Sequence, residues 1–484
     1  MKVDCVVKNC VIVRHDRCIE GSIAIDKGKI VMMTGTRTYN ECSAPGSSLM
    51  KPEKSDKSHS DSGISEIGMP EGKREIDAGG RFVIPGLIDP HMHFEWPDWD
   101  FVTGTESATK AAAAGGYTTV INHLSGSGSL RELFESRKKI VEQRGYIDTS
   151  FHMAVFTEEQ IDEISVMAEL GVTSFKFFLP YRGSEVVPPL MGIDDGIVYT
   201  GFEKIARVGY PGIALVHAEN IEIFFKLKSR VLREGKGDRV NWADVRPTIC
   251  ELESIKRIAC FSEATGCPVY IVHVSSQEGV EAIREAQVRG IRITGETCPQ
   301  YLTLTADGVD RILGKVNPPI RREKVHSEML WKALNTGTLR CIGSDHAPCA
   351  RKHKQEFWGA VVGVGGIQTV LPVLLSEGVN RGRITINKLV EITSYNTSHI
   401  FGLWPEKGAL EVGSWADLVI LDMGKKEVVK AKNLHHLSDF SLYEGWELTG
   451  WPVLTMVRGN IVMEDGEVVG KQGTGKFVPR YPKI

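Results

Sequence analysis

Four histidines and one aspartate stand at the ends of short apolar segments, where their side chains could bind a metal ion. The pair His91 and His93 follows the segment VIPGLIDP. His217 ends ALVH, His273 ends VYIVH and Asp345 ends CIGSD. Side chains of a strand alternate between its two faces, so His91 and His93 point the same way and can reach one cation. These residue types and this spacing predict a metal site.

Lys176 is a sixth candidate, within the apolar segment VTSFKFFLP. Taken alone, a lysine in such a strand usually lays its stem along apolar surface and directs its ammonium to water. Beside a metal site, however, a desolvated neutral lysine can react with CO2 to form a carbamate. The two anionic oxygens of a carbamate can bridge two cations. We therefore expect Lys176 to belong to the metal site if its strand ends at the same face.

The elements that must position these residues alternate in type along the chain. Short apolar segments are separated by stretches of helical periodicity such as TEEQIDEISVMAEL and EGVEAIREAQVRG. This alternation argues for parallel strands and predicts an α/β fold, a (β/α)8 TIM barrel whose strand C-termini converge on one face. The predicted strands cover residues 82–89, 117–123, 151–156, 172–179, 212–217, 268–274, 291–297 and 340–345.

Both ends of the chain are rich in strand patterns. We predict that residues 1–80 and 407–484 form one small β-sandwich, which flanks a barrel over residues 81–406. Residues 40–75 are rich in serine, proline and charge, and low hydrophobicity cannot offset the entropy of ordering. We expect this stretch to be a flexible insertion, a tolerated surface loop rather than a regulatory one.

Composition narrows the class of protein. The 484 residues are 42% hydrophobic and 25% charged, as in a globular protein with a sizeable core. Lys and Arg number 58 against 61 Asp and Glu, for a net charge of −3. This balance indicates neither nucleic acid nor a membrane as partner, and favours a small molecule. The N-terminus MKVDCVVKNCVIV lacks the pattern of a signal peptide, so we expect a cytoplasmic protein.

Several motifs together resemble a known family. PGLIDPHMHF, HAEN, VHVSS, ETCPQYLTL and GSDHAP, with Lys176, are similar to the cyclic amidohydrolases, which include dihydropyrimidinases or hydantoinases, allantoinases and dihydroorotases. The resemblance implies two divalent metal ions bridged by carbamylated Lys176. Zn²⁺ suits mixed nitrogen and oxygen ligands, although Mn, Fe or Co could occupy them. It places one ion on His91, His93 and Asp345, and the other on His217 and His273.

The resemblance also implies catalytic roles. A hydroxide that bridges the two metals would attack the cyclic amide, and Asp345 would act as general base and then as general acid. Tyr181 resembles the hydantoinase tyrosine that hydrogen-bonds the developing oxyanion. Asn317, in KVNPPIR, and Gly365, in GVGG, are the expected further substrate contacts. Relatives commonly assemble as homotetramers or homodimers, which is the assembly we expect.

The motifs do not decide which cyclic substrate the enzyme would hydrolyse. Tyr181 and ETCPQYL favour a hydantoin- or dihydropyrimidine-type ring, whereas KVNPPIR is similar to dihydroorotases or allantoinases. Dihydroorotases typically have an arginine where this chain has Glu95, and a carboxylate there would repel dihydroorotate. Val362 stands where dihydropyrimidinases use an asparagine. Trp96 and Phe178 are among the aromatics that suggest an apolar exocyclic group on a neutral amide, ureide or imide.

One alternative lies outside catalysis. Some relatives of dihydropyrimidinases keep the barrel, lose the ligands and serve as scaffolds in protein assembly. All six ligand positions are occupied by metal-binding residue types in this chain, which argues against a non-catalytic scaffold.

Overall fold

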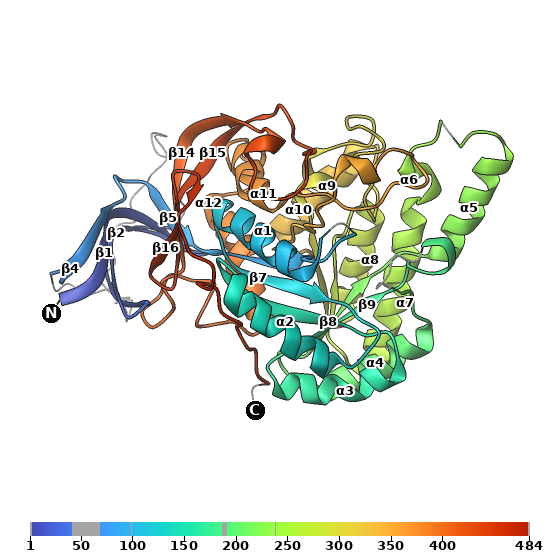
Figure 1. The fold of residues 1–484 in the computed structure, drawn as a ribbon, viewed down its shortest axis with the longest axis horizontal. Helices are drawn as coiled ribbons and strands as arrows, with labels where there is room; N and C mark the ends of the chain where they lie inside the picture. Colours follow the sequence, from blue (N-terminus) through green and yellow to red (C-terminus); the bar gives the residue numbers. More distant parts are fainter. Residues whose placement is uncertain (1, 41–67, 98, 186–190, 238, 483–484) are drawn as a thin grey trace.

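The computed structural model describes residues 2–40, 68–97, 99–185, 191–237 and 239–482. Figure 1 shows two parts, a strand-rich part that contains the N-terminus and a larger part in which helices surround a barrel of strands. Each part has its own sheet, and the two sheets confirm the predicted (β/α)8 barrel with a β-sandwich built from both ends of the chain.

The β-sandwich joins segments that lie more than 300 residues apart in sequence. Among the described residues its sheet runs in the order β17-β16-β15-β14-β5-β1-β2-β3, and β4 pairs with β1 outside this path. Antiparallel pairing of neighbouring strands, such as KVDCVVKNCVIV with CIEGSIAID, forms its N-terminal half. Its strands are β1 (Lys2–Val13), β2 (Cys18–Asp26), β3 (Lys29–Tyr39), β4 (Glu71–Asp77), β5 (Phe82–Pro85), β14 (Leu418–Val428), β15 (Glu447–Val457), β16 (Asn460–Glu464) and β17 (Glu467–Val468).

The barrel strands are parallel and buried on both faces, so they have continuous apolar segments rather than alternation. All eight predicted strands are present among the described residues, in sequential spatial order. A parallel bridge between Met92 and His346 brings the first and last strands together. The strands are β6 (Leu87–Met92), β7 (Tyr117–Leu124), β8 (Asp148–Ala154), β9 (Ser174–Phe178), β10 (Ile213–His217), β11 (Val269–Ile271), β12 (Ile293–Thr297) and β13 (Cys341–Ile342).

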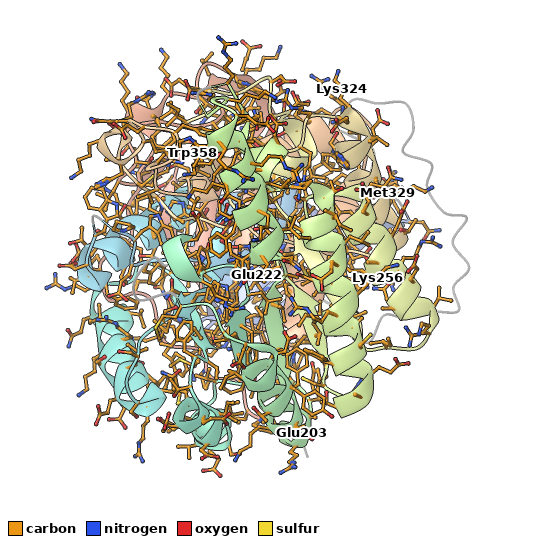
Figure 2. The ribbon with its side chains drawn as sticks, turned by 90° about the vertical axis from the view of Figure 1, so that its right-hand side faces the viewer. Glu203, Glu222, Lys256, Lys324, Met329 and Trp358 are labelled. Atoms are coloured by element: carbon orange, nitrogen blue, oxygen red, sulfur yellow. The ribbon has the colours of Figure 1, made fainter. Side chains whose placement is uncertain are left out.

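Helices cover the outside of the barrel and present charged side chains to solvent, as Glu203 and Lys256 illustrate in Figure 2. Polar caps start several of them; the Ser129 hydroxyl, for example, accepts a hydrogen bond from the Glu132 amide. The helices are α1 (Phe101–Ala114), α2 (Leu130–Arg144), α3 (Glu158–Glu169), α4 (Asp195–Val208), α5 (Ile221–Arg233), α6 (Trp242–Val245), α7 (Thr248–Thr265), α8 (Gln277–Val288), α9 (Pro299–Thr303), α10 (Lys324–Thr336), α11 (Ile367–Val373), α12 (Ile386–Val390) and α13 (Asn396–Ile400).

The predicted strand 82–89 is in fact two strands that belong to different sheets. Phe82–Pro85 is β5, which pairs with β1 and β14 of the sandwich, whereas Leu87 begins the barrel strand β6. A side chain at Gly86 would collide with Thr118, so glycine permits the chain to pass closely between the sheets. The barrel therefore begins at Leu87, and the prediction that it begins at residue 81 was wrong.

Part of the predicted flexible insertion is an ordered strand. Residues 41–67 of the insertion lie outside the described residues, but Glu71–Asp77 forms β4, parallel to β1. Its charged side chains pair with those of β1, as Lys73 does with Asp4 at 2.8 Å and Glu75 with Lys8 at 2.7 Å. The polar composition misled the prediction because a strand with one neighbour needs few apolar residues.

An apolar layer fills the barrel below the strand C-termini. Ile88, Ile121, Leu215, Tyr270 and Cys341 come from five strands and form one buried cluster. Packing of this kind closes the interior and leaves only the C-terminal face for chemistry. No helix in the described part of the chain is both long and apolar enough to cross a membrane.

Candidate metal-dependent active site

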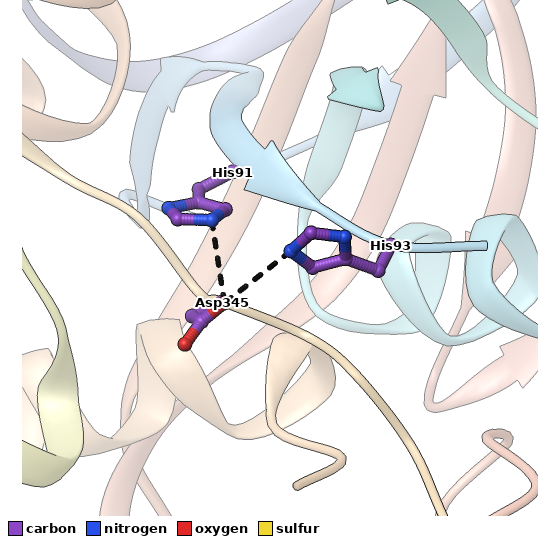
Figure 3. Close-up of side chains that lie close together, drawn as sticks. All are labelled: His91, His93 and Asp345. Carbon is purple, nitrogen blue, oxygen red and sulfur yellow. Dashed lines mark ion pairs between the residues drawn. The ribbon is translucent and has the colours of Figure 1, made fainter. Parts of the chain in front are cut away.

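Three predicted ligands from two barrel strands meet at one point (Figure 3). The Oδ1 atom of Asp345 lies 3.3 Å from His91 Nε2 and 3.6 Å from His93 Nε2. All three side chains are close enough together to hold one metal ion. Burial, and next the nearby Lys176, keep the pKa of His91 well below its ordinary value. The ring is therefore neutral, which is the form that binds metals.

The other two predicted histidines form a second pair beside the first. Nδ1 of His217 lies 3.1 Å from Nε2 of His273, and both rings are buried. The His273 ring centroid is 5.2 Å from that of His91, so the two pairs share one chamber. Burial lowers the pKa of both His217 and His273. The arrangement can supply neutral imidazole nitrogens to a second cation.

Two of these residues have an unusual backbone. His273 and Asp345 lie in the left-handed region, with φ of 42° and 48°. Tyr270 and Val272 belong to the apolar cluster inside the barrel, so simple alternation would direct His273 outward. The left-handed turn redirects its side chain into the chamber. Strain of this kind is tolerated where surrounding structure maintains it, and it concentrates at functional sites.

Glu296 orients His91, although the sequence did not single it out. Its Oε1 lies 2.5 Å from His91 Nδ1, and its Oε2 accepts a hydrogen bond from the Tyr270 hydroxyl at 2.9 Å. Burial raises the pKa of this carboxyl to about 8. A carboxyl group behind a ligand histidine fixes the ring so that the opposite nitrogen faces the metal. The ETCPQYL motif contained this residue, so its place near the end of the barrel strand β12 was the available signal.

Glu219 has the same relation to His217. Its Oε2 accepts from His217 Nε2 at 2.8 Å and from the Arg246 guanidinium at 3.2 Å. Burial alone would raise its pKa, but Arg246 and His217 lower the pKa of Glu219 to about 2. The ring therefore turns Nδ1 toward His273. Sequence analysis missed Glu219 and Arg246, although the glutamate stands two residues after His217 in HAEN.

Lys176 is fully buried in the barrel strand β9. Its Nζ has no hydrogen-bond partner among the described residues and lies 5.0 Å from the centre of the Phe178 ring. Burial lowers the pKa of Lys176 to about 7. A substantial fraction of the amine is therefore neutral near pH 7, and a neutral amine can act as a nucleophile. Lys176 therefore has the neutral amine that the predicted reaction with CO2 requires.

A cavity opens from this chamber toward solvent. Apart from the histidines and Asp345, its lining consists of Trp96, Phe178, Tyr181, Asn317, Ala347, Val362 and Gly363. No lysine or arginine from the described ranges is in this lining. Tyr181 is buried and packs edge-on against the His217 ring at 5.6 Å. A ligand here would meet neutral polar groups and apolar walls.

The remaining predicted contacts differ in their positions. Asn317 lines the cavity, where its Oδ1 accepts a hydrogen bond from Trp242 Nε1 at 2.8 Å. Gly365 does not line it, and a side chain there would collide with His436. The same loop reaches the cavity through Val362 and Gly363 instead. Glu95 accepts a hydrogen bond from Arg137 on α2 at 2.6 Å and is also outside the lining.

Comparison with known proteins decides the family. Residues 74–176 and 246–462 each match the amidohydrolase family. The L-hydantoinase of Paenarthrobacter aurescens is 34% identical over 99% of this chain and 98% of its own length. The D-hydantoinase of Geobacillus stearothermophilus is 37% identical over 84% of this chain and 88% of its own. The chain belongs to the hydantoinase branch of the amidohydrolase family.

Solved structures of this branch agree with the fold. The L-hydantoinase (dihydropyrimidinase) from Arthrobacter aurescens superposes with a TM-score of 0.85 at 32% identity, covering 99% of this chain and 100% of that one. The dihydropyrimidinase from Brevibacillus agri gives 0.84 at 28% identity, covering 99% of each chain. Amidohydrolases of this type depend on two metal ions, and the buried Lys176 Nζ and His273 Nδ1, which have no hydrogen-bond partner in the described structure, fit such a centre.

Proposed function

We propose that this amidohydrolase opens a neutral cyclic amide of the hydantoin or dihydropyrimidine type by metal-dependent hydrolysis. The observation that carries the proposal is the cavity lining, which has no lysine or arginine within the described residues beside a His and Asp cluster. A ring with a carboxylate, such as dihydroorotate, would need a cation there. Glu95 supplies no cation to the cavity, because its side chain is a carboxylate that pairs with Arg137.

The proposed centre holds one ion on His91, His93 and Asp345 and the other on His217 and His273, with carbamylated Lys176 between them. To form the carbamate, the lone pair of the neutral Lys176 amine makes an N–C bond with CO2. One C=O electron pair moves onto oxygen, and one proton leaves the nitrogen to water. Two divalent ions in this centre would lower the pKa of water and polarise the ring carbonyl. Zn²⁺ suits the ligands best, and Mn, Fe or Co could take its place.

The side chains of the chain have separate tasks in this proposal. Asp345, whose side chain is 14% exposed, accepts a proton from the attacking water and returns it to the leaving ring nitrogen. Tyr181 donates a hydrogen bond to the oxygen that gains negative charge. Burial raises the pKa of Tyr181 well above its ordinary value, so its hydroxyl keeps its proton and remains a donor. The Asn317 amide contacts a polar edge of the ring.

Apolar walls of the cavity suit an exocyclic substituent. Trp96 donates from Nε1 to the Val362 carbonyl at 3.0 Å, which joins the loop after β6 to the loop after β13. Phe178 lies beside Tyr181, with ring centroids 5.6 Å apart. These groups give favourable contact to an alkyl or aryl group and leave a hydantoin ring near Asp345.

A substrate panel tests the proposal. Metal-loaded protein is offered dihydrouracil, alkyl- and aryl-hydantoins, allantoin, dihydroorotate and cyclic imides, and ring opening is followed by chromatography. We expect substituted hydantoins to be opened faster than dihydroorotate. Preferred opening of allantoin, dihydroorotate or an imide would instead assign one of those neighbouring activities, and no opening of any ring would refute the proposal.

Metal analysis separates the proposed enzyme from a scaffold of the same fold. We expect about two ions per chain in the wild type. Lys176→Ala should lose binuclear binding, and a short-chain carboxylic acid should restore it. Assembly as a homotetramer or homodimer and a cytoplasmic location stay predictions, and sedimentation checks the first.

A further inference from the structure

His123 is a buried histidine that the proposed mechanism does not use. It lies near the end of β7, its residue is 6% exposed, and neither Nδ1 nor Nε2 has a hydrogen-bond partner among the described residues. Its neighbour His152 is different, because both ring nitrogens of His152 are bonded, to the Ser174 hydroxyl at 2.5 Å and the Pro90 carbonyl at 2.9 Å. Buried polar groups almost always have a hydrogen-bond partner. We therefore expect His123 to bond to a group that is not one of the chain's unmodified side chains.

Strand register places His123 in the same chamber as Lys176. His123 pairs with His152 across β7 and β8, and Ala154 pairs with Lys176 across β8 and β9. Since side chains two residues apart share a face, His123, His152 and Lys176 all point into the barrel. The His123 ring contacts the proposed ligands directly, with centroids 4.6 Å from His91 and 5.1 Å from His93.

A role as a further metal ligand fits the geometry poorly. The ligand atoms of His91, His93 and Asp345 cluster within 4.8 Å of one another, and neither nitrogen of His123 joins that group. Two other buried atoms near His123 have no hydrogen-bond partner among the described residues, His273 Nδ1 and Lys176 Nζ. The first belongs to a proposed metal ligand, so Lys176 is the residue left for His123 to act on. A carbamate would extend that nitrogen by about 2 Å and add two oxygens with lone pairs to spare.

We infer that His123 donates a hydrogen bond to an oxygen of the carbamate on Lys176 and so positions the group that bridges the two ions. The inference rests on the carbamate of the proposed function. A neutral imidazole carries one N–H donor, and a bond from it to an anionic oxygen is stronger than one between neutral groups. His123 is thereby a positioning residue, because it acts on the metals through Lys176.

Carbamate and metal measurements test this role without any substrate. Protein stripped of metal and CO2 receives Zn²⁺ and increasing ¹³C-bicarbonate at pH 8, and bound zinc and the ¹³C carbamate resonance are measured. His123→Phe keeps an aromatic ring for packing but removes both nitrogens, and His123→Gln restores a donor. We expect the Phe variant to need about ten- to a hundredfold more bicarbonate for half-maximal loading. The Gln variant should lie closer to the wild type.

The outcomes divide cleanly. A Phe variant with the bicarbonate dependence of the wild type would overturn the inference, as would a wild type that binds two ions without a ¹³C carbamate. If the Phe variant does not fold, judged by circular dichroism, His123→Leu takes its place under the same criteria. A protein that passes these tests but opens no ring would refute the proposed function alone, so the two failures remain distinguishable.

Discussion

The Nδ1 atom of His91 lies 2.5 Å from Oε1 of Glu296, although 205 residues separate them in the sequence. The same carboxyl oxygen accepts a hydrogen bond from the backbone amide of His273 at 3.2 Å. Glu296 thus joins one histidine from each of the two proposed metal positions. His91 and His273 are both buried, so water cannot replace Glu296 as their hydrogen-bond partner.

Glu296→Gln should weaken metal binding while leaving the fold intact. Glutamine keeps the shape but puts an amide in place of the carboxyl group that orients His91, and changes behind a ligand histidine cost about ten- to a hundredfold in metal affinity. Competition with a chelator measures the effect. Glu285→Gln, at an exposed position on α8, is the matched control and should bind zinc like the wild type. Equal affinity of the Glu296 and Glu285 variants would contradict the prediction.

The rate of carbamate formation should follow the titration of Lys176. Burial lowers the pKa of this amine to about 7, and CO2 reacts with the neutral form. At constant dissolved CO2, incorporation of ¹³C should fall about tenfold per pH unit below pH 7 and level off above about pH 8. Metal-stripped protein and excess Zn²⁺ serve for the measurement. A rate that keeps rising to pH 10 would mean that the amine has its ordinary pKa.

Glu219→Gln should destabilise the metal-free protein at neutral pH. The folded pKa of about 2 lies below the ordinary 4.5, so ionised Glu219 stabilises the fold above pH 4.5, by about 3 kcal/mol. That contribution is lost as the pH falls from about 4.5 toward 2. Denaturant unfolding at several pH values measures the difference. Glu222→Gln, an exposed neighbour on α5 labelled in Figure 2, should have little effect, and equal losses for both variants would refute the assignment.

Lys407 should anchor the barrel to the sandwich. Its Nζ lies 2.8 Å from Asp148 at the start of β8 and 2.5 Å from Asp417 just before β14, and all three are buried. Lys407→Met would remove the ammonium that lies between two buried carboxylates, of which Asp148 keeps its ion pair with Arg458. The substitution should lower the free energy of unfolding by about 3–5 kcal/mol. Thermal unfolding compares it with Lys432→Met at an exposed position. Zinc per folded chain should not change, because Lys407 and its two carboxylates lie at the opposite end of the barrel from the proposed metal site.

Local sequence patterns were sufficient for most of the barrel. Its strands are buried on both faces and its helices are amphipathic, so each element has a signal within its own residues. Two errors, at β4 and β5, have a common cause. The polar segment EGKREID becomes a strand only because β1 offers an edge, and the chain at Gly86 leaves one sheet for another, which no local pattern records.

The sequence by itself determined which residue types stand at the strand ends: the histidines, Lys176 and Asp345, whose spacing needs only the period of a strand. Only the tertiary structure decided how these side chains are oriented. Three features depend on contacts between distant strands. They are the left-handed turn at His273, the carboxyl groups of Glu296 and Glu219 behind the histidines, and the loop that lines the cavity with Val362 rather than Gly365. Such contacts exist only when the barrel closes, because closure is what brings buried polar groups far apart in sequence within bonding distance.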